Sequence, residues 1–154
     1  MEVEILHTER CTLRPATVED ADWLFGLFND PDVVTYIEGI NWFNTDVASV
    51  RSFIESMQVN ATKDLGAMWC VEYKSNNIGF ILVYDLMEDP FMTYAILPEY
   101  RFKSYMSECV SAIYNLIYRH LSLKPSISTN EINIAGSKLK QKIDNSIQET
   151  YIFS

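Results

Sequence analysis

The sequence predicts an α/β domain of the α+β kind, in which helices flank a mixed, mostly antiparallel sheet in the order β-α-α-β-β-β-α-β-α-β. Apolar residues recur at helical spacing from Ser104 to His120. Three runs rich in apolar, aromatic and branched residues, typical of strands, come between Leu65 and Leu97. With 154 residues and 48% hydrophobic content, the chain is expected to form a single domain, 1–154.

A strand and a helix are expected at the start of the chain. Glu4 to Arg14 alternates loosely between apolar and polar residues and is closed by Pro15, which is typical of an edge strand. Thr17-Val-Glu-Asp20 has the form of a capping box, which satisfies backbone amides at the start of a helix. We therefore expect a first helix from Val18 to Asn29.

A second helix and three strands follow. Thr45 is expected to cap this helix. Its inward-facing residues are Val47, Val50, Ile54 and Met57. The period then changes, and Leu65 to Lys74 and Ile78 to Asp85 are expected to pair as an antiparallel hairpin through Ser75-Asn76-Asn77. Phe91 to Leu97 returns as a third strand.

The last third of the chain begins with a basic turn from Pro98 to Lys103, which leads into the amphipathic helix Ser104 to His120. The inner face of this helix is formed by Met106, Cys109, Val110, Ile113, Leu116 and Ile117. We expect a short strand from Ser126 to Glu131, a short helix from Ile134 to Ile143 and a final strand from Ile147 to Phe153.

Composition narrows the function classes. A formal net charge of -9 and a pI near 4.6 argue against nucleic acid as a general partner and are compatible with a cationic acceptor such as an amine. No apolar run approaches the roughly 20 residues needed to cross a bilayer, and the N-terminus lacks a basic and then apolar signal. We therefore expect no membrane association and a cytoplasmic location.

Cysteine and histidine give no sign of a metal site. Cys11, Cys70 and Cys109 are widely spaced and lie in apolar stretches, so we expect them to be buried hydrophobic residues in a reducing compartment. His7 and His120 are too few and too far apart for zinc, and His120 is expected to end a helix.

The basic turn is a candidate phosphate site. When a strand, a sharp turn and a helix follow one another directly, the first backbone N–H groups of the helix point into the turn, where the helix dipole adds partial positive charge. Arg101 and Lys103 lie in this turn although the chain as a whole is acidic. Such a turn can hold a phosphate.

L-P-E-Y-R-F-K-S-Y-M-S-E, from Leu97 to Glu108, resembles the acetyl-CoA-binding segment of the GNAT superfamily of N-acyltransferases, whose pattern is R/Q-x-x-G-x-G/A. Arg101 matches the first position, whereas Ser104 and Met106 stand where the family has small residues. Two further stretches resemble the opening of the branch that acetylates ribosomal-protein N-termini: T-E-R-C-T-L-R-P-A-T-V-E-D-A (Thr8 to Ala21) and N-D-P-D-V (Asn29 to Val33).

The resemblance implies acetyl-CoA as co-substrate. The backbone of the third strand would bind the pantetheine arm, the turn and first helical residues would bind the pyrophosphate, and the asparagine of Asn133-Ile-Ala-Gly-Ser137 would contact the arm. The implied cofactor-binding residues are Tyr94, Ala95, Ile96, Leu97, Arg101, Phe102, Lys103, Ser104, Tyr105, Met106 and Asn133. If the Ser104 and Met106 side chains point into the sheet this site is intact, and if they point outward it is partly blocked.

Acetyl transfer to an amine needs a positioned nucleophile, a donor for the developing oxyanion and an acid for the departing thiolate. Family members often use a glutamate on or beside the central strands as base, and Glu72, Asp85 and Glu88 are the candidates here. Ser137 lies near the position of the family's serine beside the thiol. Glu72 and Ser137 are therefore the catalytic candidates.

The leading hypothesis is an acetyl-CoA-dependent N-acetyltransferase that acts on a small amine or a protein N-terminus, with the connection from Asp32 to Asn44 walling the acceptor pocket. The alternative is a degenerate module of the same fold that binds acyl-CoA weakly or not at all and acts in regulation or protein interaction. Relatives usually continue beyond the final strand. We therefore expect Ile147 to Phe153 to be covered by a partner chain, in a homodimer, or by its own core.

Overall fold

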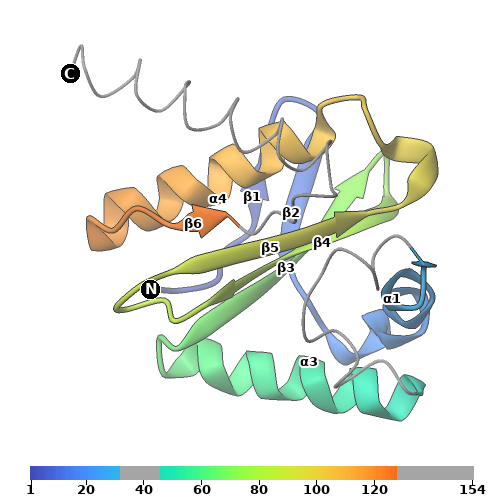
Figure 1. Cartoon of the computed structure of the whole chain (residues 1–154), viewed down its shortest axis with the longest axis horizontal. Helices are drawn as coiled ribbons and strands as arrows, with labels where there is room; N and C mark the ends of the chain where they lie inside the picture. The colour runs from blue at the N-terminus through green and yellow to red at the C-terminus, as the bar shows by residue number, and fades with distance from the viewer. Residues whose placement is uncertain (32–45, 128–154) are drawn as a thin grey trace.

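The computed structural model describes residues 1–31 and 46–127, and in these ranges six strands form one sheet in the order β1-β2-β3-β4-β5-β6 (Figure 1). The strands are β1 (Leu6–His7), β2 (Cys11–Pro15), β3 (Gly66–Tyr73), β4 (Asn76–Tyr84), β5 (Phe91–Ile96) and β6 (Ser126–Ile127). Neighbouring strands are antiparallel except β5 and β6, which are parallel. The predicted mixed, mostly antiparallel sheet is confirmed.

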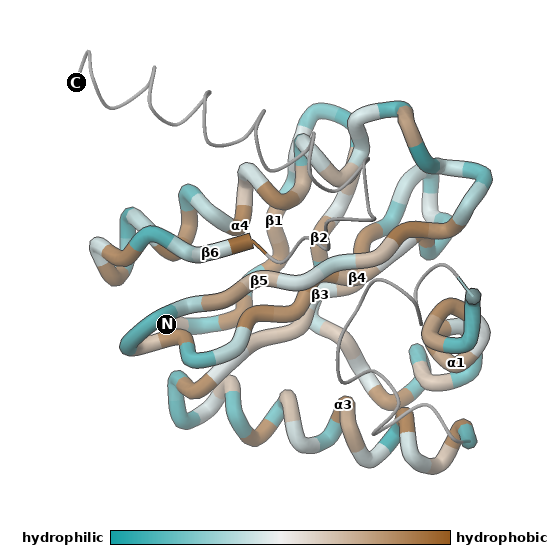
Figure 2. Tube along the Cα trace, in the orientation of Figure 1, coloured by the Kyte–Doolittle hydropathy of each residue, from teal (hydrophilic) through white to brown (hydrophobic). Residues whose placement is uncertain are grey.

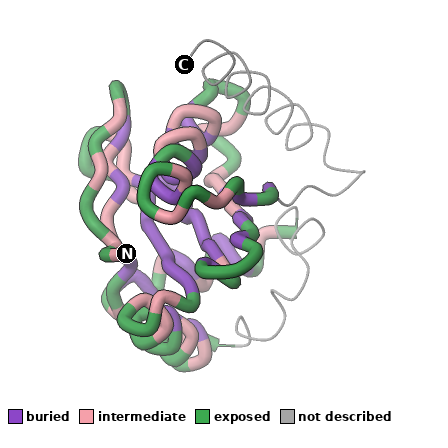
Figure 3. Tube along the Cα trace, turned by 90° about the vertical axis from the view of Figure 1, so that its left-hand side faces the viewer, coloured by how far each residue is buried: buried purple, intermediate pink, exposed green. Residues whose placement is uncertain are grey.

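Helices cover both faces of this sheet. α1 (Ala21–Phe28) and α3 (Val47–Thr62) lie on one face, and α4 (Tyr105–Leu121) lies on the other (Figure 1). Hydrophobic residues concentrate along the central strands (Figure 2), and the same strands are buried whereas the outer sides of the helices are exposed (Figure 3). Two clusters of buried apolar residues result, one against α4 and one against α1 and α3.

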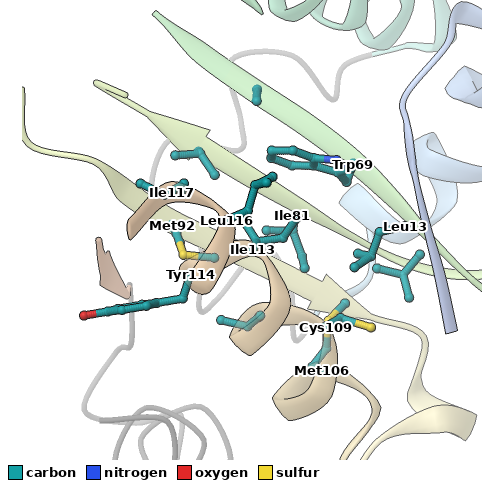
Figure 4. Packing of buried hydrophobic residues seen from close by; sticks show 14 of the residues in the cluster. Leu13, Trp69, Ile81, Met92, Met106, Cys109, Ile113, Tyr114, Leu116 and Ile117 are labelled. Carbon is teal, nitrogen blue, oxygen red and sulfur yellow. The ribbon is translucent and has the colours of Figure 1, made fainter. Parts of the chain in front are cut away.

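α4 packs on the sheet as predicted. The six apolar residues expected on its inner face are all buried: Met106, Cys109, Val110, Ile113, Leu116 and Ile117. In Figure 4 this face lies against Leu13 of β2, Trp69 of β3 and Ile81 of β4. Fully burying each of the large members stabilises the fold by about 1.5 to 3 kcal/mol relative to leaving it exposed, so this face fixes α4 across the strands.

The single edge strand predicted from Glu4 to Arg14 is wrong in its extent, because the structure has two strands there. The Thr8 N–H donates to the Cys11 carbonyl at 2.9 Å, and the Thr8 hydroxyl accepts the Cys11 N–H at 3.0 Å. This turn makes β1 the edge and places β2 inside the sheet, next to β3. The turn contains neither glycine nor proline, so the sequence pattern gave no sign of it.

Two boundaries in the middle of the chain also differ from the predictions. The N-cap of α3 is Asp46 rather than Thr45, and its Oδ1 accepts a hydrogen bond from the Ser49 N–H at 2.6 Å. The turn between β3 and β4 is Lys74-Ser75, with φ angles of 48° and 66°, so Asn76 already belongs to β4. Two left-handed residues in a row give a turn whose twist matches that of the strands.

The capping box at the first helix is confirmed. The Asp20 carboxylate accepts the Thr17 N–H at 2.9 Å, and a single 3-10 turn, η1 (Val18–Asp20), leads into α1. α1 ends at Phe28, one residue before the predicted end. Its buried residues include Leu24, Leu27 and Phe28.

Asp20 is also the centre of a buried polar network. Two Arg14 nitrogens donate to its carboxylate oxygens at 2.8 and 2.6 Å, and the Trp23 indole N–H donates at 2.8 Å. Burial disfavours the charged carboxylate, but the hydrogen bonds from Arg14, Thr17 and Trp23 outweigh burial and lower the pKa of Asp20 to about 2. The network ties β2 to the start of α1.

Several predicted elements lie wholly or partly outside the described residues. They are the connection from Asp32 to Asn44, the rest of the strand that begins with β6, the helix from Ile134 to Ile143 and the strand from Ile147 to Phe153. The cover of that last strand, by a homodimer partner or by its own core, and the single-domain organisation therefore stay predictions.

We expect stability to fall as the pH drops from about 4 to about 2. The pKa of Asp20 is about 2 in the folded chain and about 3.9 in an unfolded one, so the carboxylate contributes on the order of 2 kcal/mol above pH 4 that is lost on protonation. Asp20→Asn should lower the free energy of unfolding at pH 6 and flatten this acid limb in urea titrations. Asp22→Asn, which changes an exposed carboxyl in α1, is the control, and an unchanged acid limb in Asp20→Asn would contradict the assignment.

Candidate functional site

The candidate site lies where β5 passes into α4 (Figure 1). A 3-10 turn, η3 (Pro98–Tyr100), follows the strand, and the Leu97 N–H still donates to the Ile78 carbonyl of β4 at 2.7 Å. β5 pairs with β4 along its whole length. In the described ranges its pairing with β6 covers only Phe91 and Met92. The stretch from Tyr94 to Leu97, predicted to bind the pantetheine arm, therefore lies between this short ladder and the turn.

The turn reaches α4 through two left-handed residues. Phe102 and Ser104 have φ angles of 64° and 65°. Residues other than glycine pay about 1 to 2 kcal/mol in this region. Ser104 is the N-cap of the 17-residue helix, and its side chain makes no capping hydrogen bond to the helix amides. The position where the family pattern has glycine thus adopts the conformation that glycine favours, and the amides of the first turn carry the positive end of the helix dipole.

Met106, the second departure from the pattern, points into the sheet. Its side chain is buried, and its Cε lies 2.6 Å from where a Cβ on Gly79 would stand. The same hypothetical Cβ would lie 2.4 Å from the Ala95 carbonyl oxygen. Gly79 therefore makes room both for Met106 and for the close approach of β4 and β5. Of the two alternatives raised by the sequence for Ser104 and Met106, the inward direction holds for Met106, whose side chain does not cover the helix amides, whereas Ser104 is exposed.

Arg101 is folded back onto the end of β5. Its Nε donates to the Ile96 carbonyl at 3.1 Å, and its Nη2 lies 3.7 Å from Oδ1 of Asp30, just beyond α1. The guanidinium therefore joins the strand end and the turn to the α1 side of the molecule. Sequence reasoning identified Arg101 from the family pattern but had no signal for Asp30, because that contact is made only in the fold.

A second arginine, which sequence reasoning missed, braces the turn from the other side. Arg10 Nη1 donates to the Lys103 carbonyl, and Arg10 Nε to the Glu108 carboxylate, both at 2.9 Å. The guanidinium carbon lies 4.3 Å from the centroid of the buried Tyr105 ring. Burial opposes ionisation of Glu108, but hydrogen bonds from Thr8 and Arg10 lower its pKa. The carboxylate is therefore held charged at the start of α4, where it anchors the β1–β2 turn.

The residues predicted to bind the cofactor differ in whether their side chains are exposed to solvent or buried. The Phe102 side chain is 88% exposed, and Lys103 and Ser104 are exposed beside it. Tyr105 and Met106 bury their side chains, so these two residues can offer a ligand only backbone groups. The exposed members lie together on the turn.

Tyr94 carries an unusual polar atom. Its side chain packs against the α4-side cluster, and its hydroxyl oxygen is buried without a hydrogen-bond partner in the described part of the chain. Burial raises the pKa of Tyr94 well above its ordinary value, so the hydroxyl keeps its proton. A protonated hydroxyl in an apolar setting suits a neutral acceptor, such as a carbonyl group of a bound acyl chain.

Not all of the residues proposed as general acid or base lie at the end of the sheet where β5 passes into α4. Glu72 lies near the end of β3, opposite Asn77, and its carboxylate is 3.3 Å from Arg14 Nε. Asp85 and Glu88 lie in the connection from β4 to β5, at the opposite end of β5 from the turn. Ser137 and Asn133 lie outside the described residues. Glu72 is thus the one carboxylate of the three on the side of the sheet where β5 ends.

None of the helices in the described ranges is long and apolar enough to cross a membrane. In the same ranges, no group of three or more His, Cys, Asp or Glu side chains is placed to hold a metal ion.

Comparisons with known proteins agree with this geometry. A family model described as an acetyltransferase (GNAT) domain matches residues 10–144. No curated protein sequence matches the chain.

Solved structures show the same fold. RimL, a ribosomal L7/L12 alpha-N-protein acetyltransferase in complex with coenzyme A, has a TM-score of 0.80 and 13% identity, over 91% of this chain and 82% of that one. The ribosomal-protein-S5-alanine acetyltransferase from Vibrio fischeri has a TM-score of 0.79 and 13% identity, over 91% and 81%. The microcin C7 self-immunity acetyltransferase MccE, in complex with acetyl-CoA and AMP, has a TM-score of 0.76 and 13% identity, over 88% and 78%.

The two departures from the family pattern should have opposite effects on stability. Ser104→Gly relieves a left-handed residue and should raise the free energy of unfolding by up to about 1 kcal/mol. Met106→Ala removes a buried side chain and should lower it by about 2 to 4 kcal/mol. Urea denaturation of the two single variants measures both. A destabilised Ser104→Gly, or a Met106→Ala as stable as the parent, would contradict the described conformation of the turn.

Proposed function

The chain belongs to the acetyltransferase (GNAT) family and is an acetyl-CoA-dependent N-acetyltransferase, and from this premise we propose that its acceptor is a primary amine on a small molecule or a protein N-terminus. Two of the structurally similar proteins are, by name, acetyltransferases of ribosomal proteins. The formal net charge of -9 suits a cationic acceptor. The family match over residues 10–144 favours the enzyme over the degenerate binding module.

The observation that carries the cofactor assignment is the start of α4. Its amides follow β5 after the η3 turn, Ser104 makes no capping hydrogen bond to them, and Met106 turns away from them. Backbone amides at a helix N-terminus bind phosphate well, and exposed Lys103 adds positive charge beside them. We propose that the amides of Phe102 to Met106 hold the pyrophosphate and that Tyr94 to Leu97 hold the pantetheine arm.

Acetyl-CoA supplies an activated acyl group, so the residues of this chain have to place the amine, exclude water and handle protons. For the base we propose Glu72. β4 lies between Glu72 on β3 and the proposed arm site on β5, and two strand spacings amount to about 10 Å. In the β4 ladders Glu72 lies opposite Asn77 and Tyr94 opposite Ile81, so Glu72 would take the proton from the amine through a chain of water molecules. Ser137 stays the predicted residue beside the thiol.

We also propose a cytoplasmic location. Cys11, Cys70 and Cys109 are all free thiols and all buried, which fits a reducing compartment.

Binding of acetyl-CoA to the parent protein, measured by calorimetry, is the first test of the proposed site. Arg101→Ala should weaken binding at least about tenfold, because loss of its contacts to Ile96 and Asp30 loosens the turn that presents the amides. Affinity should also fall as salt is added. Arg119→Ala, which removes an exposed cation at the far end of α4, is the matched control. A parent protein that does not bind acetyl-CoA would refute the cofactor assignment and favour the binding module.

Turnover tests the acceptor and the base together. Release of free thiol should be seen with peptides that have a free N-terminus or with small primary amines, and should disappear when the same amine is formylated. Glu72→Gln should lower kcat/KM by about 10² to 10⁴ and remove the acid limb of its pH profile if Glu72 is the base. A profile that keeps its acid limb in Glu72→Gln would show that this carboxylate serves only as the partner of Arg14.

A further inference from the structure

Tyr94 is the one residue in the described ranges whose buried side-chain oxygen or nitrogen has no hydrogen-bond partner. It lies on β5 and faces α4, since its alternate neighbours Met92 and Ile96 pack into the same α4-side cluster. Its partner across the β4–β5 ladder is Ile81. The side chain thus packs against the α4-side apolar cluster, and its hydroxyl oxygen is buried.

Such an arrangement costs stability. A buried hydroxyl without a partner loses its hydrogen bonds to water, and no contact in the fold replaces them. Most buried polar side-chain atoms in native proteins are satisfied, so each exception calls for an explanation. Phenylalanine would fill the same space without this cost. A bound ligand with a hydrogen-bond acceptor would supply the missing partner of the hydroxyl and so explain why a tyrosine occupies this position.

The position of Tyr94 along β5 indicates which ligand supplies the acceptor atom for its hydroxyl. Tyr94 comes two residues after Met92, where the described β5–β6 ladder ends, and two residues before Ile96, whose carbonyl binds Arg101. It is therefore the first residue of the stretch proposed for the pantetheine arm. At about 3.3 Å per strand residue, it lies roughly 10 Å along β5 from Leu97, at the end of the arm away from the pyrophosphate. That is the end that carries the acetyl group.

We propose that the Tyr94 hydroxyl donates a hydrogen bond to the carbonyl oxygen of the acetyl group of bound acetyl-CoA. This inference rests on the proposed cofactor site. The hydroxyl keeps its proton because burial raises its pKa, so it acts as a donor across the working pH range. The same hydrogen bond strengthens as negative charge develops on that oxygen when the amine attacks. Because the hydroxyl oxygen is buried in the chain without ligand, the groups that cover it have to move aside as the acetyl group enters.

Tyr94→Phe tests the inference with two readouts that do not need turnover. Without ligand, the variant should melt at the same temperature as the parent or higher, because an unsatisfied polar atom has been removed. In calorimetry, its affinity for acetyl-CoA should fall about tenfold, as expected for one lost hydrogen bond. Its affinity for S-ethyl-CoA, a thioether that has no acetyl carbonyl, should equal that of the parent. Tyr84→Phe makes the same change in a partly buried tyrosine of β4 and should alter neither affinity.

The other results would overturn the inference. Equal losses for acetyl-CoA and S-ethyl-CoA would place the hydroxyl on a part that the two ligands share. A melting temperature several degrees lower without ligand would show that the hydroxyl has a structural partner, and unchanged acetyl-CoA affinity would show that it contacts no ligand. A parent protein that binds neither ligand would refute the cofactor assignment itself, which separates that failure from a failure of the role of Tyr94.

Discussion

The contact between Met106 and Gly79 is the constraint on which the site depends. Because Gly79 lacks a Cβ, the end of the Met106 side chain occupies the space where one would stand, and the first turn of α4 rests directly on β4. Interiors are close-packed, so a long side chain there needs a cavity made for it. The residue that departs from the family pattern at the helix start is thus accommodated by a glycine in the neighbouring strand. The helix amides stay uncovered by Met106 as a consequence.

The turn itself is held from two sides. Arg101 joins it to the α1 side through Asp30, and Arg10 joins it to the β1–β2 turn through Lys103 and Glu108. A single exposed ion pair is worth only about 0 to 1 kcal/mol. Here each guanidinium also donates to a backbone carbonyl, which fixes direction as well as distance. These contacts hold the turn in a conformation that its own sequence disfavours at Phe102 and Ser104.

Sequence reasoning predicted the elements whose period is strong, such as α4 and the three central strands, because periodicity reports which face is buried. It failed where a turn lacks glycine and proline, as between β1 and β2, since the only signals there are hydrogen bonds of Thr8. In the site, the family pattern identified Arg101, Ser104 and Met106. It could not give the direction of Met106 or the role of Arg10, because both depend on residues distant in sequence. The unsatisfied hydroxyl of Tyr94 likewise exists only once the core has formed.

Features that oppose folding gather on the segment from Tyr94 to Ser104. The other left-handed residues lie where an element ends or reverses direction. Lys74-Ser75 makes a tight hairpin turn, Ser122 ends α4, Asp64 follows the C-cap of α3 and Asp85 follows β4. Phe102 and Ser104 instead shape the approach to the helix amides, and Tyr94 buries a donor nearby in the chain. Locally unfavourable features persist when the surrounding structure enforces them, and they concentrate at functional sites. A ligand with an anionic end and a carbonyl end would satisfy the amides and the hydroxyl together, so one bound molecule accounts for costs at both ends of this segment.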